Sequence, residues 1–173
     1  MPKENMDELF QDVRSRLAAL ETSLPNSVDG FALSAMTKVP FKAVWFRESL
    51  CWRMAQLSRS ALECLEKKKL ASAILLARAS METSAALWYF REILERSTEV
   101  QAISETDQRL VQLLMGSKID SDILPKAENV LNFVDRVDKK IPGFRHQYER
   151  LSEFAHPNWS GTALLFSSVR MAG

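Results

Sequence analysis

Apolar residues recur every three or four positions over most of the chain, which is the spacing of one face of an α-helix. In the first such segment, residues 5–24, this stripe consists of Met6, Leu9, Phe10, Val13, Leu17, Leu20 and Leu24. A second segment, residues 41–68, places Trp45 and Trp52 seven positions apart and therefore on one face. Residues 70–96 are apolar on nearly all sides, which predicts a central, buried helix.

Three shorter helices are expected in the second half of the chain, at residues 104–115, 125–140 and 143–156. The last of them should end at His156, because Pro157 disfavours helical geometry in the residue before it. The tail, residues 162–169, is expected to be extended. Only 5 Gly and 6 Pro occur in the chain, which favours long helices over many strands and turns. The pattern therefore predicts one all-α domain, residues 1–173, built as an up-and-down helical bundle of five or six helices.

Composition and charge are those of a cytoplasmic globular protein. The net charge of +1 is not the strongly basic balance of a protein that coats nucleic acid. Two cysteines, Cys51 and Cys64, are too few for a disulfide framework and too far apart for a CxxC site, so we expect reduced thiols.

The most apolar stretch, residues 70–90, contains Arg78 and Glu82. Two charges there favour a buried core helix over a membrane span, and no membrane association is expected.

Motifs for cofactors and metals are missing from the sequence, which has no Gly-rich phosphate loop and no HExxH. Both histidines, His146 and His156, fall in the last expected helix, ten residues apart and without a carboxylate cluster. Neither a metal site nor a cofactor is therefore expected.

The last helix carries a polar stripe on the edge of an apolar face. At about 100° per residue, the stripe consists of Arg145, Glu149, Ser152 and His156. His156 lies at the helix C-terminus, where the helix dipole favours the protonated imidazolium, which can donate a proton or bind a phosphate. The alternative is a capping histidine that bonds to the last carbonyl groups of its own helix.

A second group of charges, Arg78 and Glu82, lies four residues apart on the helix expected to be most buried. Buried charges are costly unless they are paired. We therefore expect a buried ion pair, shared with Tyr148 or Ser152 of the last helix, that fixes helix register. The alternative is that this pair orients His156.

The segment Tyr148-Glu149-Arg150-Leu151-Ser152-Glu153-Phe154-Ala155-His156-Pro157-Asn158 resembles the end of a HEPN domain, a helical family. Its members carry an Arg, four to six residues, and then a His; here five residues separate Arg150 from His156. Residues 77–83 resemble the Arg/Glu-bearing central helix of HEPN-like bacterial proteins. The resemblance covers residues 70–158, and the HEPN-like core is expected to span residues 41–158.

The resemblance implies a bundle that dimerises and, in active members, cleaves RNA without metal at a site where Arg and His from two subunits meet. Arg150 and His156 would be the catalytic residues. The supporting polar network would consist of Arg78, Glu82, Arg145, Tyr148 and Ser152. Such a protein would be a toxin or phage-defence effector with an RNA substrate and an antitoxin partner. The alternative is a non-catalytic interaction module or a structural helical bundle of the same fold.

The sequence does not decide which arginine is the functional one. Helical geometry places Arg150 about 120° around the helix from His156, whereas Arg145 is about 20° away but two or three turns along. Either arginine could therefore be the functional one. A homodimer is expected, with Phe154, Trp159 and Phe166 suited to an interface rich in aromatic residues.

Overall fold

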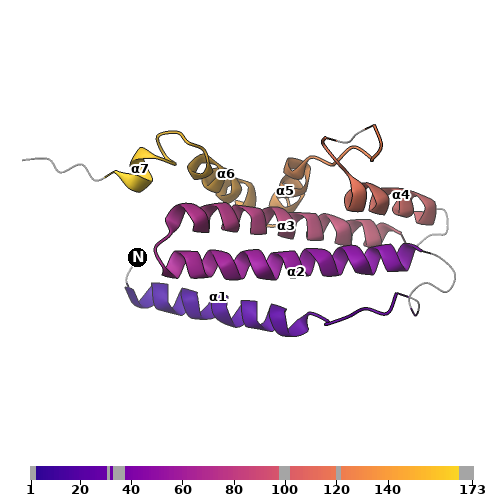
Figure 1. The fold of residues 1–173 in the computed structure, drawn as a ribbon, viewed down its shortest axis with the longest axis horizontal. Coiled ribbons are helices and arrows are strands. Elements are labelled where there is room, and N and C mark those ends of the chain that lie inside the picture. The colour runs from indigo at the N-terminus through magenta and orange to yellow at the C-terminus, as the bar shows by residue number, and fades with distance from the viewer. Residues whose placement is uncertain (1–2, 31, 33–37, 98–101, 120–121, 168–173) are drawn as a thin grey trace, which may run out of the picture.

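The computed structural model describes residues 3–30, 32, 38–97, 102–119 and 122–167. Seven helices occur within these ranges (Figure 1), namely α1 (Lys3–Ser23), α2 (Val39–Glu66), α3 (Leu70–Arg96), α4 (Ala102–Met115), α5 (Val130–Asp138), α6 (Phe144–Ala155) and α7 (Ala163–Phe166). The same ranges contain no strand, only an isolated bridge between Ser117 and Lys126. The all-α prediction is therefore confirmed. Within the described residues, no helix has the length and apolar character needed to cross a bilayer.

The long helices α2 and α3 form the centre of the molecule as an antiparallel pair (Figure 1). α1 lies along α2 on one side, whereas α4, α5 and α6 cover the pair from the other side. The larger core cluster joins α3, α5 and α6 through Ala85, Tyr89, Ile93, Phe133, Val134, Val137 and Tyr148. The central position expected for residues 70–96 is confirmed, because α3 contacts α2, α4, α5 and α6.

The tail differs from its prediction, since α7 is a single helical turn where an extended segment was expected. The turn before it is closed by local hydrogen bonds: the Thr162 amide and hydroxyl both donate to the Asn158 carbonyl oxygen. These bonds wind the chain and lead directly into α7. Residues 168–169 of the predicted tail lie outside the described residues. The count of seven helices therefore exceeds the predicted five or six.

The start of α5 also differs from its prediction, lying five residues later than expected. Asn129 caps the helix, its side-chain oxygen accepting from the Leu131 amide at 3.1 Å. The preceding residues pair with Ser117 instead, whose amide donates to the Pro125 carbonyl at 2.9 Å and whose carbonyl accepts from the Ala127 amide at 3.1 Å. This long-range pairing takes the backbone groups that a helix would have used.

Candidate functional site

The candidate site is built on α6, whose first turn is fixed by Asp138. The Asp138 carboxylate accepts hydrogen bonds from the backbone amides of Gly143 at 3.0 Å and Arg145 at 2.9 Å. Gly143 has a φ of 94°, a left-handed conformation that favours glycine. Tyr148 on the inner face of α6 is buried in the core cluster. Together these contacts determine which side chains of α6 face solvent.

Arg78, Glu82 and Tyr148 meet between α3 and α6, as the sequence predicts. The Tyr148 hydroxyl donates to Glu82 Oε1 at 2.9 Å and accepts from Arg78 Nη2 at 3.1 Å. Arg78 also pairs directly with Glu82 at 3.2 Å. The hydrogen bond to Tyr148 is the main reason that the pKa of Arg78 is raised. The side chains of Arg78 and Glu82 keep 31% and 28% of their exposure, so the predicted burial is only partial.

Ser152 does not join this network. Its hydroxyl oxygen is buried and has no hydrogen-bond partner among the described residues. The Nε atom of Arg78 is in the same condition. The network is therefore a three-residue link between α3 and α6, and Ser152 stands apart from it.

Arg145 is held on both sides by carboxylates. Its Nε donates to Glu149 at 2.7 Å, and its Nη1 donates to Asp135 of α5 at 2.6 Å. These two hydrogen bonds raise the pKa of Arg145, that to Glu149 most. Arg145 therefore braces α5 against α6 and is not free to bind a phosphate.

Arg150 and His156, unlike Arg145, have no carboxylate partner among the described residues. Both side chains are exposed, and neither makes a hydrogen bond or ion pair with a described residue. His156 terminates α6 with φ −85° and ψ 150°, so the chain leaves the helix there as predicted. The histidine side chain does not cap the described carbonyl groups of its own helix. Arg150 lies within α6, whereas His156 is the residue at which the helix ends.

His146 is a further candidate, which lies outside the motif formed by Arg150 and His156. It is exposed and lies four residues before Arg150, hence one helical turn away on the same face. It also lacks a hydrogen-bond partner within the described part of the chain. The i, i+4 spacing could have indicated this pairing from the sequence.

The turn after α6 holds the backbone of His156. Asn158 donates from Nδ2 to Glu153 at 2.6 Å and accepts from the Gly161 amide at 2.9 Å. A Cβ atom on Gly161 would lie 1.9 Å from the His156 carbonyl oxygen and 2.7 Å from that of Phe154. Only glycine allows this approach. Gly161 and Asn158 therefore position the backbone of His156, a role that no motif in the sequence indicates.

Metal-binding clusters of three or more His, Cys, Asp or Glu side chains do not occur among the described residues. Comparison with known proteins adds no assignment: no family model matches the chain, nor does any curated protein or solved structure. The arrangement of the residues themselves is therefore the basis for inferring function.

Proposed function

We propose that the chain is a metal-independent endoribonuclease of the HEPN type, acting as a homodimer. Each site would combine Arg150 of one copy with His156 of the other. A toxin or phage-defence effector restrained by an antitoxin protein is the corresponding biological role.

The observation that carries the proposal is the contrast among the basic side chains around α6. Arg145 and Arg78 are each held by a carboxylate. Arg150 and His156, the two motif residues, are exposed and unpaired among the described residues. An arginine without a partner at a surface is available to bind a phosphate. This contrast also favours Arg150 over Arg145 as the functional arginine.

The proposed reaction uses the 2′-hydroxyl of the RNA as the nucleophile. The 2′-oxygen forms a bond to the adjacent phosphorus, and the bond from phosphorus to the 5′-oxygen breaks. His156 takes the proton of the attacking hydroxyl while water protonates the leaving 5′-oxygen, or His156 protonates the leaving oxygen while water takes the proton of the hydroxyl. Arg150 stabilises the negative charge that grows on the phosphate oxygens. DNA lacks the 2′-hydroxyl and should not be cut.

The direct test is cleavage of a labelled single-stranded RNA by the purified protein in the presence of a chelator. We expect His156→Ala and Arg150→Ala each to lower the rate roughly a hundredfold to a thousandfold. Matched DNA should stay intact. Circular dichroism of each variant should show the helical content of the parent.

Two variants act as controls on the assignment. Arg145→Ala should retain more activity than Arg150→Ala, because Arg145 already has two carboxylate partners. His146→Ala tests the other exposed histidine and should cleave at the parent rate. If His146→Ala is inactive and His156→Ala is not, the reacting histidine is the one beside Arg150. If the parent protein leaves RNA intact, the proposed ribonuclease activity is excluded.

A non-catalytic interaction module is the second candidate, and it is favoured by the surface of α2. Trp45 and Trp52 are half exposed on that helix, and Phe41 stacks on Trp45 with ring centroids 6.0 Å apart. Exposed aromatic residues of this kind are typical of protein interfaces. Two results together would establish this function. The protein would leave RNA intact, and it would form a stable complex with a partner protein that Trp52→Ala disrupts.

A further inference from the structure

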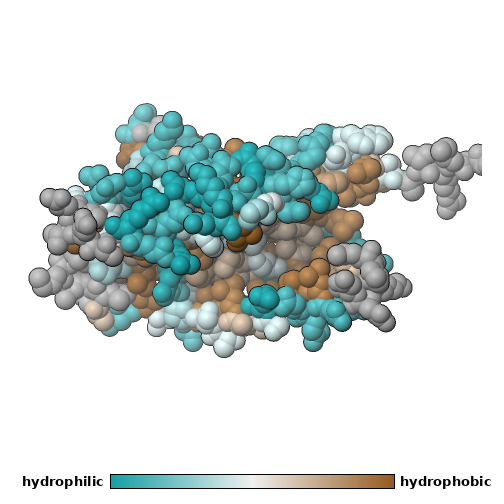
Figure 2. All heavy atoms as spheres, turned by 180° about the vertical axis from the view of Figure 1, so that it is seen from behind, coloured by the Kyte–Doolittle hydropathy of each residue, from teal (hydrophilic) through white to brown (hydrophobic). Residues whose placement is uncertain are grey.

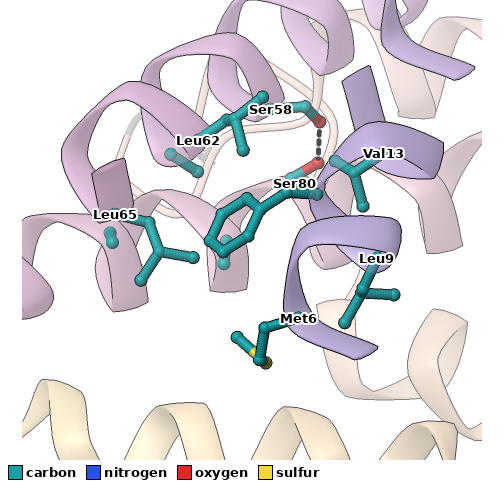
Figure 3. A pocket seen from close by; sticks show the side chains of 11 residues that line it. Met6, Leu9, Val13, Ser58, Leu62, Leu65 and Ser80 are labelled. Carbon is teal, nitrogen blue, oxygen red and sulfur yellow. Dashed lines mark hydrogen bonds between the residues drawn. The ribbon is translucent and has the colours of Figure 1, made fainter. Parts of the chain in front are cut away.

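A cavity of about 310 Å³ opens between α1, α2 and α3 (Figure 3). From α1 it is lined by Met6, Leu9, Phe10 and Val13, which are predicted core positions of that helix. Met6, Leu9 and Val13 retain 37–49% of their exposure. The apolar stripe of α1 is therefore only partly covered by the bundle. The volume of the cavity suits a small ligand.

Small residues on the opposite wall explain why the cavity exists. Ala61 on α2 and Ala73 and Ala77 on α3 line it, so part of the wall that faces α1 carries only methyl side chains. Ser58 and Ser80 bond to each other at 2.7 Å across α2 and α3 (Figure 3). Because each hydroxyl has the other as a partner, an apolar group can lie against them at little cost.

Three lysines occupy the turn at one end of this cavity. Leu65 of α2 and Ala73 of α3 line the cavity, and Lys67, Lys68 and Lys69 form the turn that joins the two helices. All three are exposed, and none forms an ion pair with a described residue.

The nearby acidic groups do not cancel this charge. Glu66 is already paired with Arg14 at 2.6 Å, and the exposed Glu63, also in the last turn of α2, is outnumbered by the three lysines. Asp7, Glu8 and Asp12 lie together on a different face of α1, away from the residues that line the cavity. An apolar cavity therefore opens beside a cationic turn, which is complementary to a molecule with an apolar chain and an anionic head.

We infer that this cavity binds a free medium-chain or long-chain carboxylate. The alkyl chain lies against Leu9, Val13 and Leu62, which line the cavity from α1 and α2 (Figure 3). The carboxylate lies at the turn, beside the ammonium groups of Lys67 and Lys69. Hydrophobic residues reach the surface in the lower half of Figure 2, on the side formed by α1, α2 and α3 (Figures 1 and 2). This site is separate from α6 and does not depend on the proposed ribonuclease.

The test is isothermal titration calorimetry of the full chain with monomeric dodecanoate, compared with dodecyltrimethylammonium, which has the same chain and the opposite charge. We expect one dodecanoate per chain and much weaker binding of the cation. The double variant Lys67→Glu/Lys69→Glu should weaken dodecanoate binding about tenfold, because it replaces two exposed cations beside the carboxylate with two anions. Lys139→Glu/Lys140→Glu makes the same charge change at the end of α5 and should bind like the parent.

Variants that fill the cavity provide a second test of the proposed binding site. Ala77→Phe places a ring in the space and should abolish binding; if that variant does not fold, Met6→Trp at the mouth of the cavity serves the same purpose. Equal binding of the two amphiphiles, or an equal effect of the two lysine variants, would overturn the inference. So would binding to anionic phospholipid vesicles without binding of monomeric dodecanoate. A dimer that Ala77→Phe converts to monomer, with no dodecanoate bound by the parent, would show that a second copy covers the cavity instead.

Discussion

The hydroxyl of Tyr148 is shared between a cation and an anion on the neighbouring helix. It accepts from Arg78 and donates to Glu82, and the two charges also contact each other. The Arg78 guanidinium lies 5.4 Å from the centre of the Tyr148 ring, so it also has a cation–π contact. The three side chains bond to one another and fix the register of α3 against α6.

Two variants of this network should separate the contribution of the Tyr148 hydroxyl to stability from that of the Glu82 charge. Tyr148→Phe should lower the free energy of unfolding by about 1 kcal/mol, because Arg78 can still pair with Glu82. Glu82→Ala should cost more, about 2 kcal/mol, because it removes the charged partner of both groups. Urea unfolding measures both. Equal stability of Glu82→Ala and the parent protein would show that the network does not hold α6.

Gly161 controls the backbone that carries His156. Gly161→Ala should lower the free energy of unfolding by about 1–3 kcal/mol, because the new methyl group meets backbone carbonyl oxygens that cannot rotate away. It should also shift the imidazole resonances of His156 in an NMR spectrum. Ser160→Ala, one residue earlier, is the matched control and should leave both unchanged. Unaltered resonances in Gly161→Ala would mean that the turn does not position the histidine.

At the scale of elements, α1 is the least firmly attached long helix. Leu17 is its only buried hydrophobic residue among those whose side chains the structure describes. Two ion pairs connect it to α2: Arg59 donates to Glu21, with Nε at 2.9 Å from Oε1, and Arg14 pairs with Glu66 at 2.6 Å. Attachment of α1 should therefore depend on the charge of these carboxylates.

Acid should loosen α1 before the rest of the bundle. The hydrogen bond from Arg59 lowers the pKa of Glu21 below its ordinary value. A carboxylate of this kind stabilises the fold above its unfolded pKa, and that contribution is lost as the pH falls through the folded pKa. Hydrogen exchange should show falling protection factors in α1 on acidification while α3 stays protected. Glu21→Gln should show reduced protection of α1 already at neutral pH. Asp12→Asn, whose partner Arg16 is within α1, should not.

The sequence predicts the long helices well and their connections poorly. α3 is predictable because its residues are apolar on nearly every side, which only a central helix can bury. The start of α5 is not, because Ser117 pairs with residues 125–127 through contacts that no local pattern records. α7 forms because Asn158 and Thr162 close a turn that composition alone presents as irregular.

The candidate site divides in the same way. The contact of Arg78 and Glu82 with Tyr148 follows from the cost of leaving charges unpaired near a core. The engagement of Arg145 by Asp135 does not, because it depends on how α5 packs against α6. Periodicity placed Arg145 in line with His156, and the three-dimensional packing gives Arg145 other partners.

At the scale of the whole molecule, large apolar side chains are exposed beyond the end of α6. Trp159 retains 71% of its exposure and Phe166 74%, and Leu164 between them is also exposed. Phe154, the third residue expected at an interface, is half-buried. These residues lie within ten positions of His156 in the chain, where the proposed second copy must bind.

The proposed dimer should therefore depend on this surface. Sedimentation velocity should show a dimer for the parent protein and a monomer for Trp159→Glu, because a charge buried in an apolar interface lacks a partner. Trp45→Glu, on the exposed face of α2, makes the same change elsewhere and should remain dimeric. A parent protein that sediments as a monomer at high micromolar concentration would remove the composite site.

Mixing two inactive variants tests the central claim most directly. Arg150→Ala and His156→Ala should each cleave RNA roughly a hundredfold to a thousandfold more slowly than the parent, because every site in either homodimer lacks one of its two groups. After subunit exchange, half of the dimers are mixed and each contains one complete site, so the mixture should regain about a quarter of the parent activity. A mixture that stays inactive after exchange has been verified would contradict a site shared between two copies.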